Sequence, residues 1–198
     1  VIPASRTDTG VHALGQVVHL QTATALDLAT LQRALNAVLP QDIAVREIAP
    51  ATEGFHARYS ARSREYGYTI LNTPVRSPLA RRHVAHVAQP LDIAAMQAAA
   101  AVLLGDHDFA SFGGKMWEGG STQRTVYRLT VQREGDVVTV GIVANAYLSR
   151  MVRAIVGCLI AVGLGNLTPA DIQRILAARD RRQVKWLAPP QGLCLIRV

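Results

Sequence analysis

The sequence has no apolar run of about 18 residues, the length that predicts a membrane-spanning helix, and no signal-peptide pattern in its first residues. It also has only two cysteines, Cys158 and Cys194, which lie far apart in apolar surroundings and do not form a Cys-x-x-Cys pattern. We therefore expect neither a transmembrane segment nor a disulfide framework. We interpret both cysteines as reduced core residues of a cytoplasmic protein.

Lysine is almost absent too: Lys115 and Lys185 are the only two, so 19 of the 21 basic residues are arginine. The formal net charge of +7 suggests an acidic partner, although a codon bias toward arginine would produce the same excess. Between residues 58 and 90, Glu65 is the only acidic residue, against Arg58, Arg62, Arg64, Arg76, Arg81 and Arg82. Tyrosines stand among these arginines, and such a segment can bind phosphates and stack on bases. A solvated surface would have a similar composition.

What is present indicates a globular chain. The 198 residues are 49% hydrophobic and 18% charged, which is enough to bury a sizeable core in one or two domains. Helical spacing predicts helices over residues 27–39, 92–104 and 148–163 and from Thr168 onward. Alternating β-forming residues predict strands over 16–20, 43–48, 55–71, 125–131, 137–143 and 192–198. The arginines on alternate positions of the 55–71 strand would give it one basic face. This mixture of hairpins and helices predicts an α+β fold, with helices packed on one face of a largely antiparallel sheet.

The loop from Gly105 to Ser121 has little periodicity and is our candidate for a mobile segment. It contains Asp106-His107-Asp108, which resembles a set of metal ligands. Three consecutive residues rarely converge on one ion, so we expect no metal site there. His83 and His86 have helical spacing, but in a basic stretch they are better interpreted as contacts to phosphate or solvent.

The candidate for chemistry is the stretch from Arg6 to His12, Arg-Thr-Asp-Thr-Gly-Val-His. Gly10 permits a positive φ or a close approach of the backbone to a ligand, and the β-branched run that follows would hold the turn rigid. A carboxylate beside an arginine in such a turn makes Asp8 our candidate catalytic residue. An aspartate that merely caps the turn would give the same local pattern.

Arg153 stands out because it lies in a helix that is apolar nearly all round. A guanidinium among Val152, Val156 and Ile160 is costly unless a carboxylate or a phosphate pairs with it. The alternative is that its long side chain reaches solvent.

Four motifs together resemble the TruA-type tRNA pseudouridine synthases. The Arg6–His12 stretch is similar to the family pattern Gly-Arg-Thr-Asp-Ala-Gly-Val-His, with Ser5 where the family usually has glycine. The other three matches are Phe55-His56-Ala57-Arg58-Tyr59-Ser60-Ala61 with Arg64-Glu65-Tyr66-Gly67-Tyr68, Asn145-Ala146-Tyr147 through Met151 to Gly157, and Gly192-Leu193-Cys194-Leu195. They occur in the family's order over nearly the whole chain. Because the chain begins almost on the first motif, the resemblance implies that the family's opening strand and helix are missing.

The resemblance implies two ferredoxin-like halves that form one sheet, with the active site in the cleft between them. We accordingly expect an incomplete amino-terminal subdomain over residues 1–55 and a carboxy-terminal subdomain over 56–198. It also implies a homodimer and a tRNA substrate modified in the anticodon stem-loop, at tRNA positions 38 to 40. The reaction breaks the bond from ribose C1′ to uracil N1 and joins C1′ to C5, so no redox change occurs and we expect no cofactor and no metal.

The family pattern also implies roles for individual residues. Asp8 is the expected nucleophile, and Arg153 is its ion-pair partner, which would favour the ionised carboxylate. Arg6 would help to hold the flipped nucleotide or its phosphate, Tyr66 would stack on the flipped base, and Leu193 would form an apolar wall. The charge of the 58–90 stretch, and not the family pattern, makes Arg58, Arg62 and Arg64 our candidates for contacts to the RNA backbone.

Two other functions fit parts of the sequence. Asp8-Thr9-Gly10 is the Asp-Thr-Gly tripeptide of aspartic proteases, but that mechanism needs two carboxylates that share a proton, and this chain has one such tripeptide. An adjacent arginine would also disfavour the shared proton. A non-catalytic RNA-binding module is the third possibility, suggested by the missing amino-terminal elements.

Overall fold

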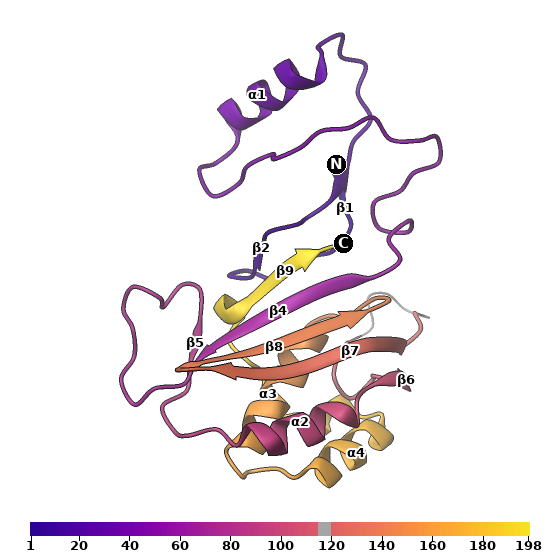
Figure 1. Cartoon of the computed structure of the whole chain (residues 1–198). Coiled ribbons are helices and arrows are strands. Elements are labelled where there is room, and N and C mark those ends of the chain that lie inside the picture. The colour runs from indigo at the N-terminus through magenta and orange to yellow at the C-terminus, as the bar shows by residue number, and fades with distance from the viewer. Residues whose placement is uncertain (115–119) are drawn as a thin grey trace.

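The computed structural model describes residues 1–114 and 120–198, and a seven-stranded sheet forms its centre (Figure 1). The strands are β2 (His12–Ala13), β4 (Arg64–Leu71), β5 (Ala85–His86), β6 (Gly105–Asp108), β7 (Gln123–Glu134), β8 (Val137–Ala144) and β9 (Leu193–Arg197). Six of them run in the order β2-β9-β4-β8-β7-β6, and β5 also pairs with β4. Only the β2–β9 and β4–β5 pairs are parallel. The predicted largely antiparallel sheet is therefore confirmed.

Three helices cover one face of this sheet: α2 (Ile93–Ala101), α3 (Met151–Gly163) and α4 (Pro169–Ala178) (Figure 1). Two of these helices are capped by side chains, since Asp92 accepts from the Ala95 amide and Thr168 forms a reciprocal capping box with Asp171. Along β4, buried residues alternate with half-buried ones, so one row of side chains enters the core beneath α3. Two 3₁₀ turns, Arg181–Gln183 and Pro190–Gly192, lie on the path from α4 to β9.

The carboxy-terminal half has the ferredoxin-like arrangement. Its elements follow the order β4-α2-β7-β8-α3, with α4 inserted before β9, and its four strands lie side by side as β9-β4-β8-β7. This is the split βαβ pattern, in which the first and third strands are neighbours at the centre. The motif residues of β4, α3 and β9 are thereby brought to adjacent places in one half.

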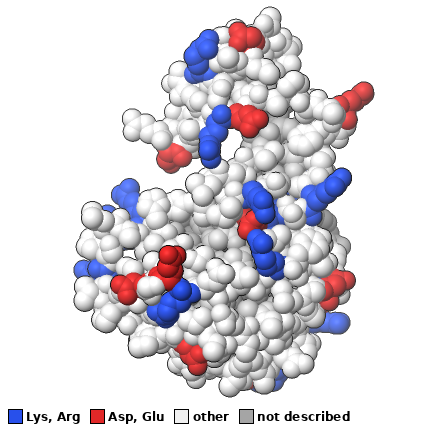
Figure 2. Space-filling model, viewed as in Figure 1, with Lys and Arg blue, Asp and Glu red and all other residues white. Residues whose placement is uncertain are grey.

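Residues 1–55, all of which the structure describes, contribute less regular structure. They hold a two-stranded sheet of β1 (Ile2–Pro3) and β3 (Val18–His19), the edge strand β2, and α1 (Leu28–Val38), which has no buried residue. Helix α1 stands away from the large sheet, and Figure 2 shows the part that contains it as a lobe on a narrower neck. Residues 1–55 therefore form no ferredoxin-like unit of their own in this structure, and the division into two such halves stays a prediction.

The strand predicted over residues 43–48 does not form, and side chains of α1 explain why. Asn36 accepts from the Val45 amide at 2.7 Å and donates to its carbonyl at 2.9 Å, while Gln32 donates to the carbonyls of Val45 and Arg46. These amide side chains take the place of a neighbouring strand. The segment is therefore extended but belongs to no sheet.

Two other predicted boundaries were wrong. The strand predicted over 55–71 begins only at Arg64, because residues 55–60 close a turn in which the Ser60 amide donates to the His56 carbonyl. The loop predicted from Gly105 begins instead with β6, which pairs with β7. The middle of that loop, residues 115–119, lies outside the described residues.

Candidate active site

A cavity of about 840 Å³ lies where the four motifs meet. Its walls come from residues 1–8, from the segment that leads into β4, from the 145–153 segment that opens α3, and from Leu193 at the start of β9. The volume is within the range of small-molecule sites and is large enough for a nucleotide. This one cavity is lined by most of the predicted site residues, namely Asp8, Arg153, Arg6, Tyr66, Leu193, Arg58 and Arg64.

Asp8 lies in a tight turn that is anchored on both sides. The Val11 amide donates to the Asp8 carbonyl at 3.0 Å, and Gly10 has a φ of +83°, in the left-handed region that favours glycine. Beyond the turn, β2 pairs in parallel with β9, so the turn is held against the strand that provides Leu193. The Asp8 side chain is 37% exposed, which leaves the carboxylate accessible from the cavity.

Arg153 pairs with Asp8 across 145 positions of sequence, with Nη1 donating to Oδ2 at 2.7 Å. It lies in the first turn of α3, and its Nε donates to the Ala188 carbonyl at 2.9 Å. Ala188 comes this close because Gly157 lacks a side chain: a Cβ there would lie 2.8 Å from the Trp186 backbone. The Arg153 side chain is only 13% exposed, so it does not extend into solvent. Two fixed contacts therefore orient the guanidinium toward the carboxylate.

Tyr66 is 5% exposed and is held on two sides. Its hydroxyl lies 2.8 Å from the Ser5 Oγ, and its ring meets Tyr147 edge to face at 5.2 Å. The Ser5 backbone is itself clamped by Gln16, which donates to the Ser5 carbonyl and accepts from its amide. Burial raises the pKa of Tyr66, so the phenol is neutral at physiological pH. Ser5, where the family pattern has glycine, thus supplies a contact that glycine could not make.

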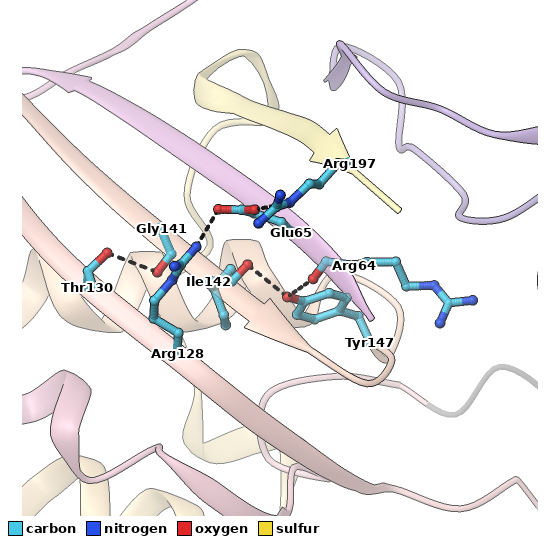
Figure 3. Close-up of polar contacts among 8 residues, drawn as sticks. All are labelled: Arg64, Glu65, Arg128, Thr130, Gly141, Ile142, Tyr147 and Arg197. Carbon is cyan, nitrogen blue, oxygen red and sulfur yellow. Dashed lines mark hydrogen bonds and ion pairs between the residues drawn. The ribbon is translucent and has the colours of Figure 1, made fainter. Parts of the chain in front are cut away.

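Tyr147 fastens the third motif to the sheet (Figure 3). Its hydroxyl donates to the carbonyls of Arg64 and Ile142 at 3.0 and 3.1 Å, and burial raises its pKa. Glu65, the neighbour of Arg64, instead receives Arg128 and Arg197 at 2.6 and 2.7 Å. Glu65, the only acidic residue between residues 58 and 90, is therefore paired with two arginines.

The prediction that Arg64 belongs to an outer basic face was wrong. Arg64 is 7% exposed, and its guanidinium donates to the carbonyls of Asn145 at 2.8 Å and Ala4 at 3.2 Å. Burial lowers its pKa. Arg64 shares its row of β4 with Tyr66, Tyr68 and Ile70, and this whole row enters the core. Arg64 therefore ties residues 1–8 to the third motif from beneath the cavity.

We expect Arg64→Lys to lower the free energy of unfolding by about 2 kcal/mol, because one ammonium cannot span carbonyls that a planar guanidinium reaches together. Arg62→Lys is the matched control, since Arg62 is exposed and two positions away. Chemical denaturation of both variants measures the difference. Equal stability of the two variants would contradict the role given to Arg64.

The remaining arginines are distributed over the surface. Arg62, Arg76, Arg81 and Arg82 are exposed and do not line the cavity, whereas Arg6 and Arg58 do. Figure 2 shows basic and acidic side chains interspersed on one face of the molecule. His12, from the Asp8 motif, contacts the Arg82 carbonyl through Nε2 at 2.7 Å and lies beside His83, so the 76–82 loop is joined to the turn that carries Asp8.

Two polar residues that line the cavity received no role from the sequence, although one of them, Asn145, belongs to the third motif. Arg124, at the start of β7, has a buried Nε with no hydrogen-bond partner among the described residues, and burial lowers its pKa. Asn145 organises the cavity wall by accepting from the amides of Thr125 and Ala146. An arginine at a strand end and an asparagine in a loop carry no periodic signal, so no sequence pattern pointed to their contacts.

Two side chains of the Asp106-His107-Asp108 stretch contact protein groups. His107 contacts the Leu104 carbonyl, and Asp108 accepts from the Ala110 amide and lies 3.6 Å from Arg179. Within residues 1–114 and 120–198, no group of three or more His, Cys, Asp or Glu side chains is arranged to hold a metal ion. The same residues contain no helix with the length and hydropathy needed to cross a membrane. Both cysteines are free.

Chemically, the cavity offers one carboxylate fixed by an arginine, a buried aromatic ring and an apolar wall. A carboxylate held in this way can form a covalent bond with a sugar or another electrophilic carbon. Because its partner is a guanidinium, it is not one of two acids that share a proton, as an aspartic protease requires.

Comparison with known proteins agrees with this geometry. The family model described as tRNA pseudouridine synthase matches residues 1–60 and 99–198. Proteins named tRNA pseudouridine synthase A are similar over almost the whole chain: that of Thermoanaerobacter sp. (strain X514) is 45% identical over 198 residues, covering 100% of this chain and 81% of the relative. That of Herminiimonas arsenicoxydans is 46% identical over 200 residues, covering 98% and 72%. That of Chloroflexus aurantiacus (strain ATCC 29366 / DSM 635 / J-10-fl) is 45% identical over 202 residues, covering 100% and 73%. The chain belongs to the tRNA pseudouridine synthase family.

Proposed function

We propose that this chain isomerises uridine to pseudouridine in tRNA and that Asp8 is its nucleophile. The observation that carries the proposal is the Asp8–Arg153 ion pair of 2.7 Å, in a nucleotide-sized cavity that also holds Tyr66. The Arg153 guanidinium donates to Asp8 Oδ2 and so holds the carboxylate in one orientation for attack. Family membership supports the same activity.

The proposed reaction needs no external reactant. Asp8 forms a covalent bond with the substrate, the N1–C1′ bond breaks, and the freed uracil turns within the cavity. C1′ then joins C5, the C5 proton leaves to solvent, N1 gains a proton, and Asp8 is released. The target must leave its stack to reach Asp8, and Tyr66 replaces part of the lost stacking from within the cavity.

We further propose that the modified uridines lie in the anticodon stem-loop, at tRNA positions 38 to 40. The test is to incubate unmodified tRNA with the protein and map every pseudouridine formed. Modification at those positions supports the whole proposal, whereas modification confined to another arm would reject the substrate site and retain the activity. Binding without any pseudouridine would favour a non-catalytic RNA-binding module.

The affinity for tRNA should depend steeply on salt. The basic segment, which we define as Arg58, Arg62, Arg76, Arg81 and Arg82, would release counterions when it contacts phosphates. With roughly four contacts, the affinity should fall about 100-fold between 50 and 200 mM salt. Filter binding at a series of salt concentrations measures the slope.

Charge removal within the basic segment should flatten this dependence. Arg81→Ala combined with Arg82→Ala is expected to reduce the slope of log affinity against log salt by about 2. Arg174→Ala, on α4 and therefore remote from the cavity, removes one exposed guanidinium as the control. An unchanged slope in the double variant would show that these arginines do not contact phosphate.

We also propose a cytoplasmic homodimer with subdomains over residues 1–55 and 56–198. Two free cysteines and a tRNA-modifying family support the compartment. The homodimer is what the resemblance to the TruA-type family implies. Sedimentation analysis of the purified protein measures the oligomeric state.

A further inference from the structure

Tyr59 is an aromatic side chain that the proposed chemistry does not use. It lines the active-site cavity, yet its residue is 74% exposed, so it stands at the rim rather than in the interior. Tyr66, by contrast, is 5% exposed and lies deep in the same cavity. The cavity therefore has an inner aromatic ring and an outer one, supplied by the same motif.

The Tyr59 ring is held in place by a stack of rings behind it. His56 stacks on Tyr59 at 4.3 Å with an interplanar angle of 29°, and His19 meets His56 edge to face at 4.7 Å. Phe55 packs edge-on against His19, which belongs to β3. A ring fixed in this way loses little conformational entropy when a ligand stacks on it.

Backbone hydrogen bonds fix the turn that carries these rings. The Tyr59 amide donates to the His56 carbonyl at 3.0 Å, and the His56 amide donates to the Ser60 hydroxyl at 3.0 Å. His19 Nδ1 accepts from the Ala57 amide at 3.0 Å, which joins the turn to β3. The exposed ring is thus part of a rigid platform, and its exposure is not the result of a loose loop.

The surroundings of Tyr59 indicate the chemistry of its ligand. The Arg58 guanidinium carbon lies 6.0 Å from the Tyr59 ring centroid, and Arg6 and Arg124 also line the cavity. An aromatic face beside arginines is the combination that binds single-stranded nucleic acid, because bases stack on the ring while phosphates contact the cations. With His56 on one side and 74% of the residue still accessible, the ring retains surface for a planar ligand.

We propose that Tyr59 is a stacking subsite for a second, unpaired nucleobase, one that neighbours the target uridine in the same RNA. This inference rests on the proposed function and deepens it. The enzyme would then hold two bases at once, the target in the cavity at Tyr66 and its neighbour at the rim on Tyr59. Substrate choice would depend on whether the neighbouring nucleotide can unstack as well as on the target uridine.

The test uses the whole chain and an RNA stem-loop in which a fluorescent purine analogue replaces the base next to the target uridine. Stacking on Tyr59 should quench the fluorescence when the parent protein binds. Tyr59→Ala should lose the quench and raise KM about 10-fold with kcat nearly unchanged, whereas Tyr59→Phe, which keeps the ring, should resemble the parent. Tyr127→Ala removes another exposed tyrosine, 58% accessible on β7 and not among the residues that line the cavity, and should change neither quantity.

Two results separate this subsite from the proposed function. If the parent protein forms pseudouridine and Tyr59→Ala keeps both the quench and the parent KM, the subsite is wrong while the activity stands. If the parent forms no pseudouridine but its quench depends on Tyr59, the activity is wrong while the base-stacking site stands. The unfolding temperature of Tyr59→Ala is compared with that of the parent protein. Equal temperatures show that a lost quench or a raised KM arises from the missing ring and not from a damaged fold.

Discussion

Asp8→Asn is expected to abolish pseudouridine formation, with a loss of at least about 10⁴-fold in kcat, while tRNA affinity stays within a few fold of the parent. Asparagine has nearly the same shape, so the turn closed by Val11 and Gly10 should persist. Its neutral amide oxygen lacks the negative charge that makes the carboxylate oxygen nucleophilic. Arg153 would keep an oxygen to contact, which limits the damage to the cavity.

The matched control is Asp42→Asn, which makes the same chemical change at an exposed position outside the cavity. It should retain the parent rate. Pseudouridine is quantified in tRNA after incubation, and affinity is measured by filter binding on the same preparations. Substantial turnover by Asp8→Asn, after deamidation back to aspartate has been excluded by mass spectrometry, would remove Asp8 from the role of nucleophile.

Arg153→Met should be nearly inactive, at least about 10³-fold below the parent, and yet as stable as the parent or more so. Methionine fills much of the space in the first turn of α3 and removes a charge that is 13% exposed. Asp8 then loses the hydrogen bond and the counter-charge that fix the orientation of its carboxylate. Arg153→Lys keeps a charge but cannot contact Ala188 and Asp8 with one planar group, so its activity should also fall sharply.

The contrast between stability and rate distinguishes this role from a structural one. Denaturant unfolding and kcat are measured for Arg153→Met, Arg153→Lys and, as the control, Arg174→Met on α4, where the arginine is 74% exposed. The control should keep the parent rate. Near-normal turnover by Arg153→Met would show that the ion pair is dispensable, and a large loss of stability would show that the pair mainly supports the fold.

Elements with strong local signals were predictable from the sequence. The hairpin of β7 and β8 followed from two alternating runs, and α4 begins beside Thr168, where a helix was expected. The pairing of Arg153 with a carboxylate was predictable for another reason: a guanidinium in an apolar helix needs a counter-charge, and the structure has Asp8 at 2.7 Å. The catalytic role assigned to that pair stays a prediction.

Features that depend on distant partners were not predictable. Residues 43–48 alternate like a strand. In the structure, however, the side chains of Asn36 and Gln32 form the hydrogen bonds to this backbone that a neighbouring strand would otherwise form. Arginine is usually a surface residue, and nothing in the neighbouring sequence indicates that Arg64 is buried. Its guanidinium can lie in the core because it donates to the carbonyls of Ala4 and Asn145, which are far away in the sequence. The periodicity of a sequence indicates which residues lie on the same face of a strand. Whether that face is buried or exposed, and whether the strand forms at all, depends on polar partners that are distant in the sequence.

The central claim is that this chain makes pseudouridine at a cavity built around Asp8 and Arg153, and release of tritium from tRNA labelled at uridine C5 tests it most directly. Joining C1′ to C5 expels the C5 hydrogen, so each turnover liberates one label into water. The account predicts release by the parent protein and by Asp42→Asn, and none above background by Asp8→Asn at equal tRNA occupancy. Equal release by Asp8→Asn and the parent, or no release by the parent from tRNA that it binds, would contradict it.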